Sequence, residues 1–330
     1  MATPASILPV HERRSRLLNR VNLSVLILAV GCVALVLIGA IVYPGFLSLG
    51  YILHQLQIAS FLGVIATGAM LVIVLGELDL SVPWTITGTA IVVTSLAGSH
   101  NEPLADLAVP LGLATGAVIG LVNGLGVALF RVPAMVWTLA VNAMLLGAAT
   151  FYTGGFKPPG AVPSLATYAA LGHTLGIPNA FLLWIVIGII TLWLLHRTVY
   201  GMYLYAMGNS QRALFLAGAR VRTITVCTFV LAGILSSLGA ILLTGYTNQA
   251  YQGMGDPYLM PVIAAVVIGG TSIQGGSGSY IGTFVGALFI TLLSSILAVM
   301  QMSDAARQII FGAIILAMLL VYRSSEKDRA

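Results

Sequence analysis

Apolar runs of about twenty residues recur along this 330-residue chain, separated by short breaks of glycine, proline and charged residues. The hydrocarbon core of a bilayer is about 30 Å thick, and roughly 20 helical residues cross it. Only 7% of the residues are charged, against about 25% in a typical soluble domain. Such a chain cannot build a water-soluble surface, and its runs lack the alternating pattern of a membrane β-barrel. The sequence therefore predicts an all-α polytopic membrane protein.

Ten apolar runs are predicted to be membrane-spanning helices. They are Val21–Tyr43, Tyr51–Leu75, Ser81–Leu96, Leu107–Phe130, Pro133–Tyr152, Ala180–His196, Thr223–Tyr246, Tyr258–Gly270, Tyr280–Met300 and Ala305–Tyr322. Because ten is an even number, both termini lie on the same side of the bilayer. We expect a basic N-terminal segment at 1–20, a transmembrane domain at 21–322 with a loop at 197–222, and a tail at 323–330.

The basic residues predict which side of the bilayer the termini occupy. Cytoplasmic loops of membrane proteins carry an excess of lysine and arginine. With both termini inside, all of the 14 basic residues except Lys157 and Arg307 fall in the segments on the inner side. We therefore expect both termini and the loop at 197–222 to be cytoplasmic.

Glycines recur every four residues in two of the predicted helices. Small residues at this spacing line one face of a helix and let a neighbouring backbone come close. They are Gly112, Gly116, Gly120 and Gly124 in the fourth span, and Gly278, Gly282 and Gly286 around the start of the ninth. Spans two to five form one group and spans seven to ten a second, and the two groups cross the membrane in opposite directions. The fourth and the ninth span hold the same position within their groups. The pattern favours an inverted repeat, as in many transporters, with Gly76–Pro83 matching Gly253–Met260.

Two carboxylates, Glu77 and Asp79, stand between the second and third spans, bracketed by Gly76 and Pro83. A charge at the centre of a bilayer costs about 2.5–3.5 kcal/mol on insertion scales and usually faces a cavity or a partner. The simplest interpretation is that both acids cap the third span, with Asp79 accepting from a backbone N–H of the following turn. We expect Asp79 chiefly to hold this helix start and Glu77 to tune the cavity. A direct role toward a solute or a proton is the alternative.

Uncharged polar residues within the spans are further candidates. Asn123 and Asn142 could bind a polar solute, although hydrogen bonding between helices is the favoured interpretation. The complete set of predicted path or gate residues is Glu77, Asp79, Ser81, Asn123, Thr138, Asn142, Thr271 and Ser272.

A basic loop, residues 200–223, joins spans six and seven and contains a short helix-forming stretch. Asn209 or Ser210 is its predicted N-cap, and Gly218 its predicted end. The apolar side chains at 214–216 favour a docking surface. A helix lying in the membrane interface is the alternative.

Several functions are excluded because the required residues are missing. The glycine-rich segment Ile268–Ser279 lacks the lysine of a phosphate-binding loop, since the only lysines are Lys157 and Lys327. An intramembrane serine protease would need a histidine downstream of Ser277 as its base, and none follows His196. The HExxH metal motif is absent as well. We expect no catalytic residue, no metal and no nucleic-acid partner.

Five stretches carry a resemblance that runs from about Leu47 to Val321. They are GELDLSV, LVNGLGVALFRVPAMVWTL, TGG at 153–155, GMYLYAMGNSQRALFLAGARV and IAAVVIGGTSIQGGSGSYIGTFVGAL. Together they resemble the permease subunits of ATP-binding cassette (ABC) importers for sugars, the family of the ribose, xylose, arabinose and autoinducer-2 permeases. The sequence departs from the family pattern at Glu77 and Pro83, where glycine is usual, and at Ala219, where isoleucine is usual.

The resemblance implies a transport subunit of the bacterial inner membrane without an ATPase site or cofactor of its own. The implied partners are a second permease subunit, identical or paralogous, two cytoplasmic subunits that bind ATP and Mg²⁺, and a periplasmic solute-binding protein. The loop at 197–222 then couples to the ATPase through Gly208, Asn209, Arg212, Ala213 and Gly218. The expected solute is a sugar or sugar-like compound. The alternatives are an ABC permease for nucleosides or branched-chain amino acids, and a stand-alone carrier with Glu77 as its proton site.

Overall fold

The computed structural model describes residues 10–99, 102–155 and 160–327. Within these ranges the chain forms fourteen α-helices, two short 3-10 helices and one two-stranded hairpin. In chain order they are α1 Val10–Val42, η1 Pro44–Leu47, α2 Leu49–Val74, α3 Val82–Ala97, α4 Glu102–Asp106, α5 Ala108–Phe130, α6 Ala134–Thr153, α7 Ser164–Leu171, β1 His173–Thr174, β2 Ile177–Pro178, α8 Asn179–Arg197, α9 Val199–Asn209, α10 Gln211–Leu216, α11 Val221–Thr247, η2 Asp256–Tyr258, α12 Leu259–Ile268, α13 Tyr280–Val299 and α14 Asp304–Lys327. The predicted all-α class is confirmed.

Each predicted span coincides with a helix. In the described part of the chain, α2, α5, α6, α8, α11 and α13 are long and apolar enough to cross a bilayer, and three shorter apolar helices cover Val25–Ile41, Val82–Ala97 and Asp256–Ile268. The chain is therefore a polytopic membrane protein. Helix α1 begins at Val10, so that residues 10–20 of the predicted basic segment are helical. Residues 1–9, Lys157 and residues 328–330 of the predicted tail lie outside the described ranges.

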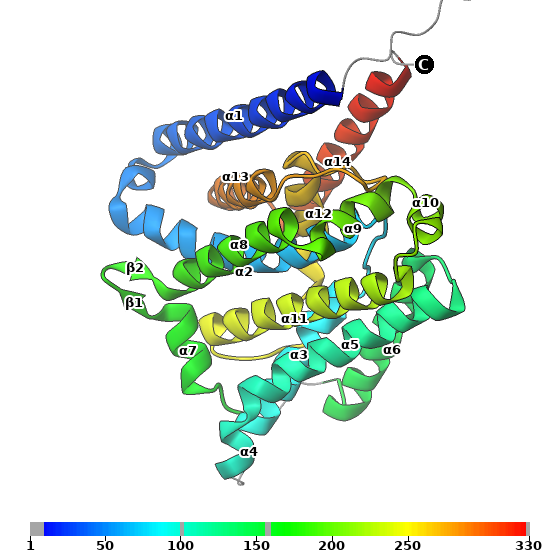
Figure 1. The fold of residues 1–330 in the computed structure, drawn as a ribbon. Coiled ribbons are helices and arrows are strands. Elements are labelled where there is room, and N and C mark those ends of the chain that lie inside the picture. Colours follow the sequence, from blue (N-terminus) through cyan, green and yellow to red (C-terminus); the bar gives the residue numbers. More distant parts are fainter. Residues whose placement is uncertain (1–9, 100–101, 156–159, 328–330) are drawn as a thin grey trace, which may run out of the picture.

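Helices α2 and α11 contact each other at the centre of the molecule (Figure 1). Helix α2 also packs on α12 and α13, and α11 packs on α3 and α5. On one side α3 contacts α5 and α6, and on the other α12 contacts α13 and α14. Exchanging α2, α3, α5 and α6 with α11, α12, α13 and α14 leaves these contacts unchanged, although the contact of α5 with α6 has no counterpart of similar extent between α13 and α14. Helices α1 and α8 lie outside it, against α13 and α2 respectively.

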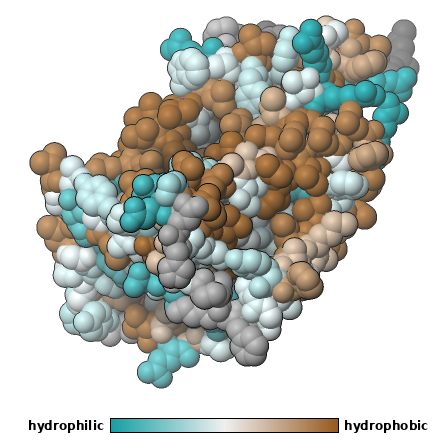
Figure 2. Space-filling model, turned by 90° about the horizontal axis from the view of Figure 1, so that it is seen from below, coloured by the Kyte–Doolittle hydropathy of each residue, from teal (hydrophilic) through white to brown (hydrophobic). Residues whose placement is uncertain are grey.

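The core of the protein is built around α2, whose residues from Ala59 onward are all buried. A helix that is apolar on every side is stable only where protein or lipid surrounds it. The outer helices carry large exposed apolar side chains instead, such as Phe151, which is 92% exposed. Hydrophobic side chains (brown) cover much of the face drawn in Figure 2, with hydrophilic patches (teal) toward its edges. Such a surface suits lipid rather than water.

Glycines set the closest helix contacts. A Cβ added at Gly116 of α5 would lie 2.3 Å from the carbonyl oxygen of Gly233 in α11, and one at Gly120 would lie 2.2 Å from that of Phe229. No real Cβ approaches a carbonyl oxygen so closely, and α5 can therefore rest on α11 only because these positions have no side chain. The other glycines predicted to pack also face neighbouring segments. Gly112 faces α3 and α11, and Gly124 faces α11. Gly278, Gly282 and Gly286 face α12 or the loop that follows it.

Candidate functional site

The segment 76–81 links α2 to α3 and holds both predicted carboxylates. Asp79 Oδ1 accepts hydrogen bonds from Ser81 N at 2.9 Å and from Ser81 Oγ at 2.6 Å. Asp79 therefore accepts the kind of backbone hydrogen bond expected of a cap, although the donor lies just before α3 rather than within its first turn. Burial raises the pKa of Asp79, and the hydrogen bonds from Ser81 oppose that rise.

Polar side chains of α5 and α6 converge on the same segment. Asn123 of α5 is fully buried and donates from Nδ2 to Ser81 Oγ at 2.7 Å. From α6, Thr138 Oγ1 accepts from Leu80 N at 2.9 Å, and Asn142 Oδ1 accepts from Trp84 N at 3.3 Å. Backbone N–H groups at a helix start have no partner within the helix, and here a neighbouring helix supplies their acceptors.

We call Asp79, Ser81, Asn123, Thr138 and Asn142 the α3 clamp. The sequence analysis predicted all five residues as candidates, but it did not predict that they meet at the start of one helix. Their hydrogen bonds run to the protein's own backbone and to each other, while Asn123 Oδ1 is buried without a partner among the described residues. This geometry favours the helix-bridging interpretation of Asn123 and Asn142 over direct contact with a solute.

Glu77 does not belong to the α3 clamp, because its hydrogen bond joins it to α6 and not to α3. It lies near the start of α6, where a hydrogen bond with the backbone of Ala134 lowers the pKa of its carboxyl group. Burial has the larger effect and raises that pKa above its ordinary value. The positive end of the α6 dipole gives the carboxylate a favourable position.

Glu77 also lines a hollow of about 1110 Å³ formed by the end of α5, the start of α6 and the segments from α9 to α11. Four arginines line the same hollow: Arg131, Arg212, Arg220 and Arg222. Among the described residues the one salt bridge joins Arg307 to Asp304, at a different site. The hollow is therefore strongly basic, with Glu77 as its one carboxylate.

The predicted coupling loop folds into α9 and α10. Ser210 rather than Asn209 caps α10, since its Oγ accepts from Ala213 N at 3.3 Å, and Gly218 follows the helix with a φ of +83°. Asn209 instead donates to Gly276 O at 3.0 Å. A Cβ added at Gly208 would lie 2.1 Å from Gly276 N. These two residues thus fix α9 to the loop that follows α12.

Thr271 and Ser272 lie in that loop, between α12 and α13. Thr271 is fully buried, and its hydroxyl finds no hydrogen-bond partner among the residues described. Ser272 Oγ accepts from Gln274 N at 3.3 Å within the loop. Gly276 N donates to Val74 O at 2.9 Å, which ties the loop to the end of α2. The structure places both residues in this loop rather than in the α3 clamp.

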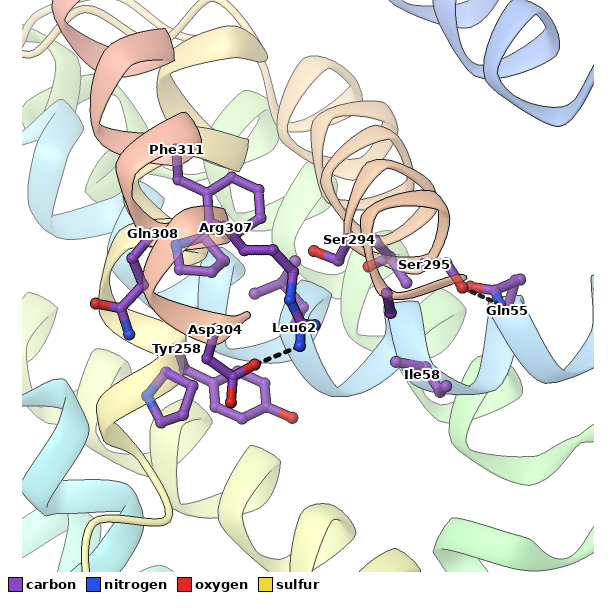
Figure 3. A pocket seen from close by; sticks show the side chains of 14 residues that line it. Gln55, Ile58, Leu62, Tyr258, Ser294, Ser295, Asp304, Arg307, Gln308 and Phe311 are labelled. Carbon is purple, nitrogen blue, oxygen red and sulfur yellow. Dashed lines mark hydrogen bonds and ion pairs between the residues drawn. The ribbon is translucent and has the colours of Figure 1, made fainter. Parts of the chain in front are cut away.

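A second pocket, of about 310 Å³, opens between α2, α12, α13 and α14 (Figure 3). The sequence analysis missed it. Gln55 and the pair at 294–295 are polar residues within predicted spans, the same signal that drew attention to Asn123. Further polar groups of its lining come from Thr291 of α13 and from Asp304, Arg307 and Gln308 of α14.

The long apolar helices and their glycine-mediated packing define the class as a polytopic α-helical membrane protein. The chain belongs to the family described as branched-chain amino acid transport system / permease component, whose model matches residues 51–319. No solved structure matches it.

Named relatives cover most of the chain. The ribose import permease protein RbsC of Escherichia coli K12 is 32% identical over 295 residues, which is 88% of this chain and 91% of the relative. RbsC of Bacillus subtilis is 34% identical over 295 residues, 89% and 91% of the two chains. The autoinducer 2 import system permease protein LsrC of Enterobacter sp. (strain 638) is 33% identical over 284 residues, 84% and 80%.

Family membership confirms the predicted class, the permease component of an ABC importer. It also confirms that the chain is a transport subunit rather than an enzyme.

Proposed function

We propose that this chain forms the transmembrane path of an importer for a sugar or sugar-like solute in the bacterial inner membrane, with ATP hydrolysis supplied by partner subunits. The observation that carries the solute class is the full-length similarity to permeases named for ribose and autoinducer 2. The family description, which names branched-chain amino acids, keeps amino-acid import as the second candidate.

The proposed architecture has ten membrane-spanning helices with an inverted repeat of spans two to five and seven to ten. The exchangeable pattern of helix contacts supports it. The starts of the two short helices also meet, because Gly255 N donates to Thr87 Oγ1 at 3.1 Å and a Cβ at Gly255 would lie 2.0 Å from Pro83 O. Broken helices whose N-termini meet near the middle of the bilayer are a recurring device of transporters built from inverted repeats.

Both termini and the loop at 197–222 are proposed to be cytoplasmic, with 21–322 as the permease domain between segments 1–20 and 323–330. The loop then docks on two ATPase subunits that hold ATP and Mg²⁺. Phe215 and Leu216 support this role, since they are 68% and 77% exposed beside Arg212 and the basic hollow. A second permease subunit, identical or paralogous, and a periplasmic solute-binding protein complete the proposed assembly.

The α3 clamp is proposed to support a gate rather than to bind solute. Its hydrogen bonds fix the start of α3 against α5 and α6. Thr271 and Ser272 are proposed to act at the neighbouring loop, which the glycine contacts of Gly208 connect to α9. Movement of α9 and α10 would then reach the ends of α2 and α12 directly.

The test is uptake by the full assembly in proteoliposomes, with D-ribose, L-leucine and adenosine compared. ATP-dependent uptake of ribose, lost when the ATPase subunits are omitted, is the expected result. Uptake of leucine alone would establish the second candidate. Accumulation by the purified chain alone under a pH gradient would replace the importer with a stand-alone carrier.

A further inference from the structure

The pocket between α2, α12, α13 and α14 has the size and lining of a small-molecule site. Its volume of about 310 Å³ lies at the lower end of the range of about 300–1,000 Å³ found for ligand pockets. Ile58, Leu62 and Phe311 give it apolar walls, and Tyr258 contributes an aromatic ring (Figure 3). Polar groups come from α2, α13 and α14, so three different helices aim hydrogen-bonding atoms at one space.

Gln55 supplies the first unsatisfied atom. Its side chain is only 6% exposed, and its Nε2 donates to Ser295 Oγ at 2.7 Å. Ser295 Oγ is also within 2.9 Å of Tyr51 OH, so that both contacts orient the amide. The amide oxygen, Oε1, is buried without a hydrogen-bond partner among the described residues.

Arg307 supplies the second unsatisfied atom. Its Nη2 pairs with Asp304 Oδ1 one turn earlier on α14. Its Nε is buried and likewise lacks a partner in the described part of the chain. An unsatisfied buried polar atom costs about 1–3 kcal/mol. The side chains that carry this unpaired acceptor and this unpaired donor line the same pocket, from α2 and α14 (Figure 3).

We infer that this pocket binds a neutral polyhydroxyl solute, a sugar in its ring form, with hydroxyl groups donating to Gln55 Oε1 and accepting from Arg307 Nε. A hydroxyl group both donates and accepts. A carboxylate alone can satisfy Arg307 but not Gln55, and an ammonium group alone can satisfy Gln55 but not Arg307. A zwitterionic amino acid could reach both atoms, but its ammonium group would meet only the neutral amide of Gln55, because Asp304 is already paired with Arg307. The Asp304–Arg307 pair leaves the lining with no net charge, which selects a neutral ligand over either ion.

The inference rests on the proposed sugar import and adds a site within a single subunit. In the proposed topology α2 and α14 begin, and α13 ends, on the outer side of the membrane. The pocket therefore receives solute where a binding protein would release it. It shares no residue with the α3 clamp.

Binding is measured on the purified full-length chain in nanodiscs by saturation-transfer NMR, with D-ribose, D-xylose, D-glucose and L-leucine as probes. Gln55→Leu removes the acceptor, and Arg307→Lys keeps the charge beside Asp304 but removes Nε. Gln57→Leu is the matched control, because Gln57 is a buried amide of the same helix that donates to Ala170 O at 2.5 Å and does not line the pocket. Thermal melting verifies that each variant is folded, and ATP-driven uptake of the same probes by the assembled transporter is measured in parallel.

At least one sugar is expected to bind, leucine is not, and each pocket variant is expected to weaken sugar binding at least tenfold while Gln57→Leu leaves it within twofold. Sugar binding that neither pocket variant weakens overturns the site. So does absence of binding when the assembled transporter still imports the same sugar, a result that leaves the proposed function intact. Uptake and binding of leucine in place of sugars overturn the proposed function and the pocket together.

Discussion

Asn123 of α5 donates to Ser81 Oγ across 2.7 Å, although the two residues stand 42 positions apart in the chain. Ser81 Oγ in turn donates to Asp79 Oδ1 at 2.6 Å. A continuous chain of buried polar groups thus joins the middle of one membrane helix to the start of another. Any displacement of α3 relative to α5 must break it.

Asn123→Ala is expected to lower the free energy of unfolding by about 1–3 kcal/mol, because it leaves the Ser81–Asp79 pair short of a buried donor. The measurement is thermal unfolding of the purified protein. Thr115→Ala is the control on the same helix, since Thr115 is only half-buried and donates to Leu111 O of its own turn. If Asn123 acts through Ser81, the double variant with Ser81→Ala will lose less stability than the two single losses added together.

Gly116→Ala is expected to destabilise the protein by about 1–3 kcal/mol, the usual cost of overpacking, because the new methyl group would collide with Gly233 O of α11. Melting temperatures report the change. Gly50→Ala serves as control because a Cβ there meets nothing within 4 Å. Equal stability of the two variants would show that α5 and α11 have room to separate.

Glu77→Gln is expected to stabilise the protein at neutral pH and to lose that advantage in acid. Burial raises the pKa of Glu77 above its value of 4.5 in the unfolded chain. The folded protein thus binds the proton more tightly, and its stability falls as the pH rises from 4.5 through the raised pKa. Glutamine removes this cost. Melting curves of both proteins between pH 4 and pH 8 provide the measurement, and a difference that stays constant with pH would refute the effect.

Arg212→Glu is expected to leave the fold intact and to reduce solute-stimulated ATP hydrolysis at least about tenfold, which corresponds to about 1.4 kcal/mol of lost coupling. The reason is that Arg212 lines the basic hollow beside the exposed α10 surface. Arg197→Glu makes the same charge reversal at the first residue of the loop, exposed in the last turn of α8 and outside the hollow, and it separates a role of the hollow from a general effect of charge on the loop. Normal stimulation in proteoliposomes carrying Arg212→Glu would remove this residue from the coupling role.

The sequence predicted where the membrane helices lie because hydropathy alone decides which segments leave water. It missed α9, whose eleven residues mix apolar and polar side chains, although Thr198 caps it by accepting from Gly201 N at 3.3 Å. It also placed the start of the first helix at Val21 instead of Val10, because the intervening turns are charged. A helix can extend beyond the bilayer into a charged segment, and hydropathy does not mark that extension.

Individual contacts of the candidate site were less predictable. That Asn123 bridges helices was the favoured interpretation, but its partner depends on how α5 is rotated toward α3, which no local pattern fixes. The contact of Glu77 with α6 was not predicted for the same reason: α6 is far away in sequence and near in space. The pocket of Gln55 and Arg307 needs four helices to be assembled before its polar atoms share one space.

The complete burial of α2 from Ala59 to its end at Val74 has a consequence for biogenesis. Helices leave the ribosome in order, yet the neighbours that enclose α2, namely α11, α12 and α13, emerge after more than half of the chain has been made. Until then α2 is surrounded by lipid or by the insertion machinery. Its final enclosure is therefore a late step of maturation, when the second half of the protein closes around a helix that entered the membrane long before.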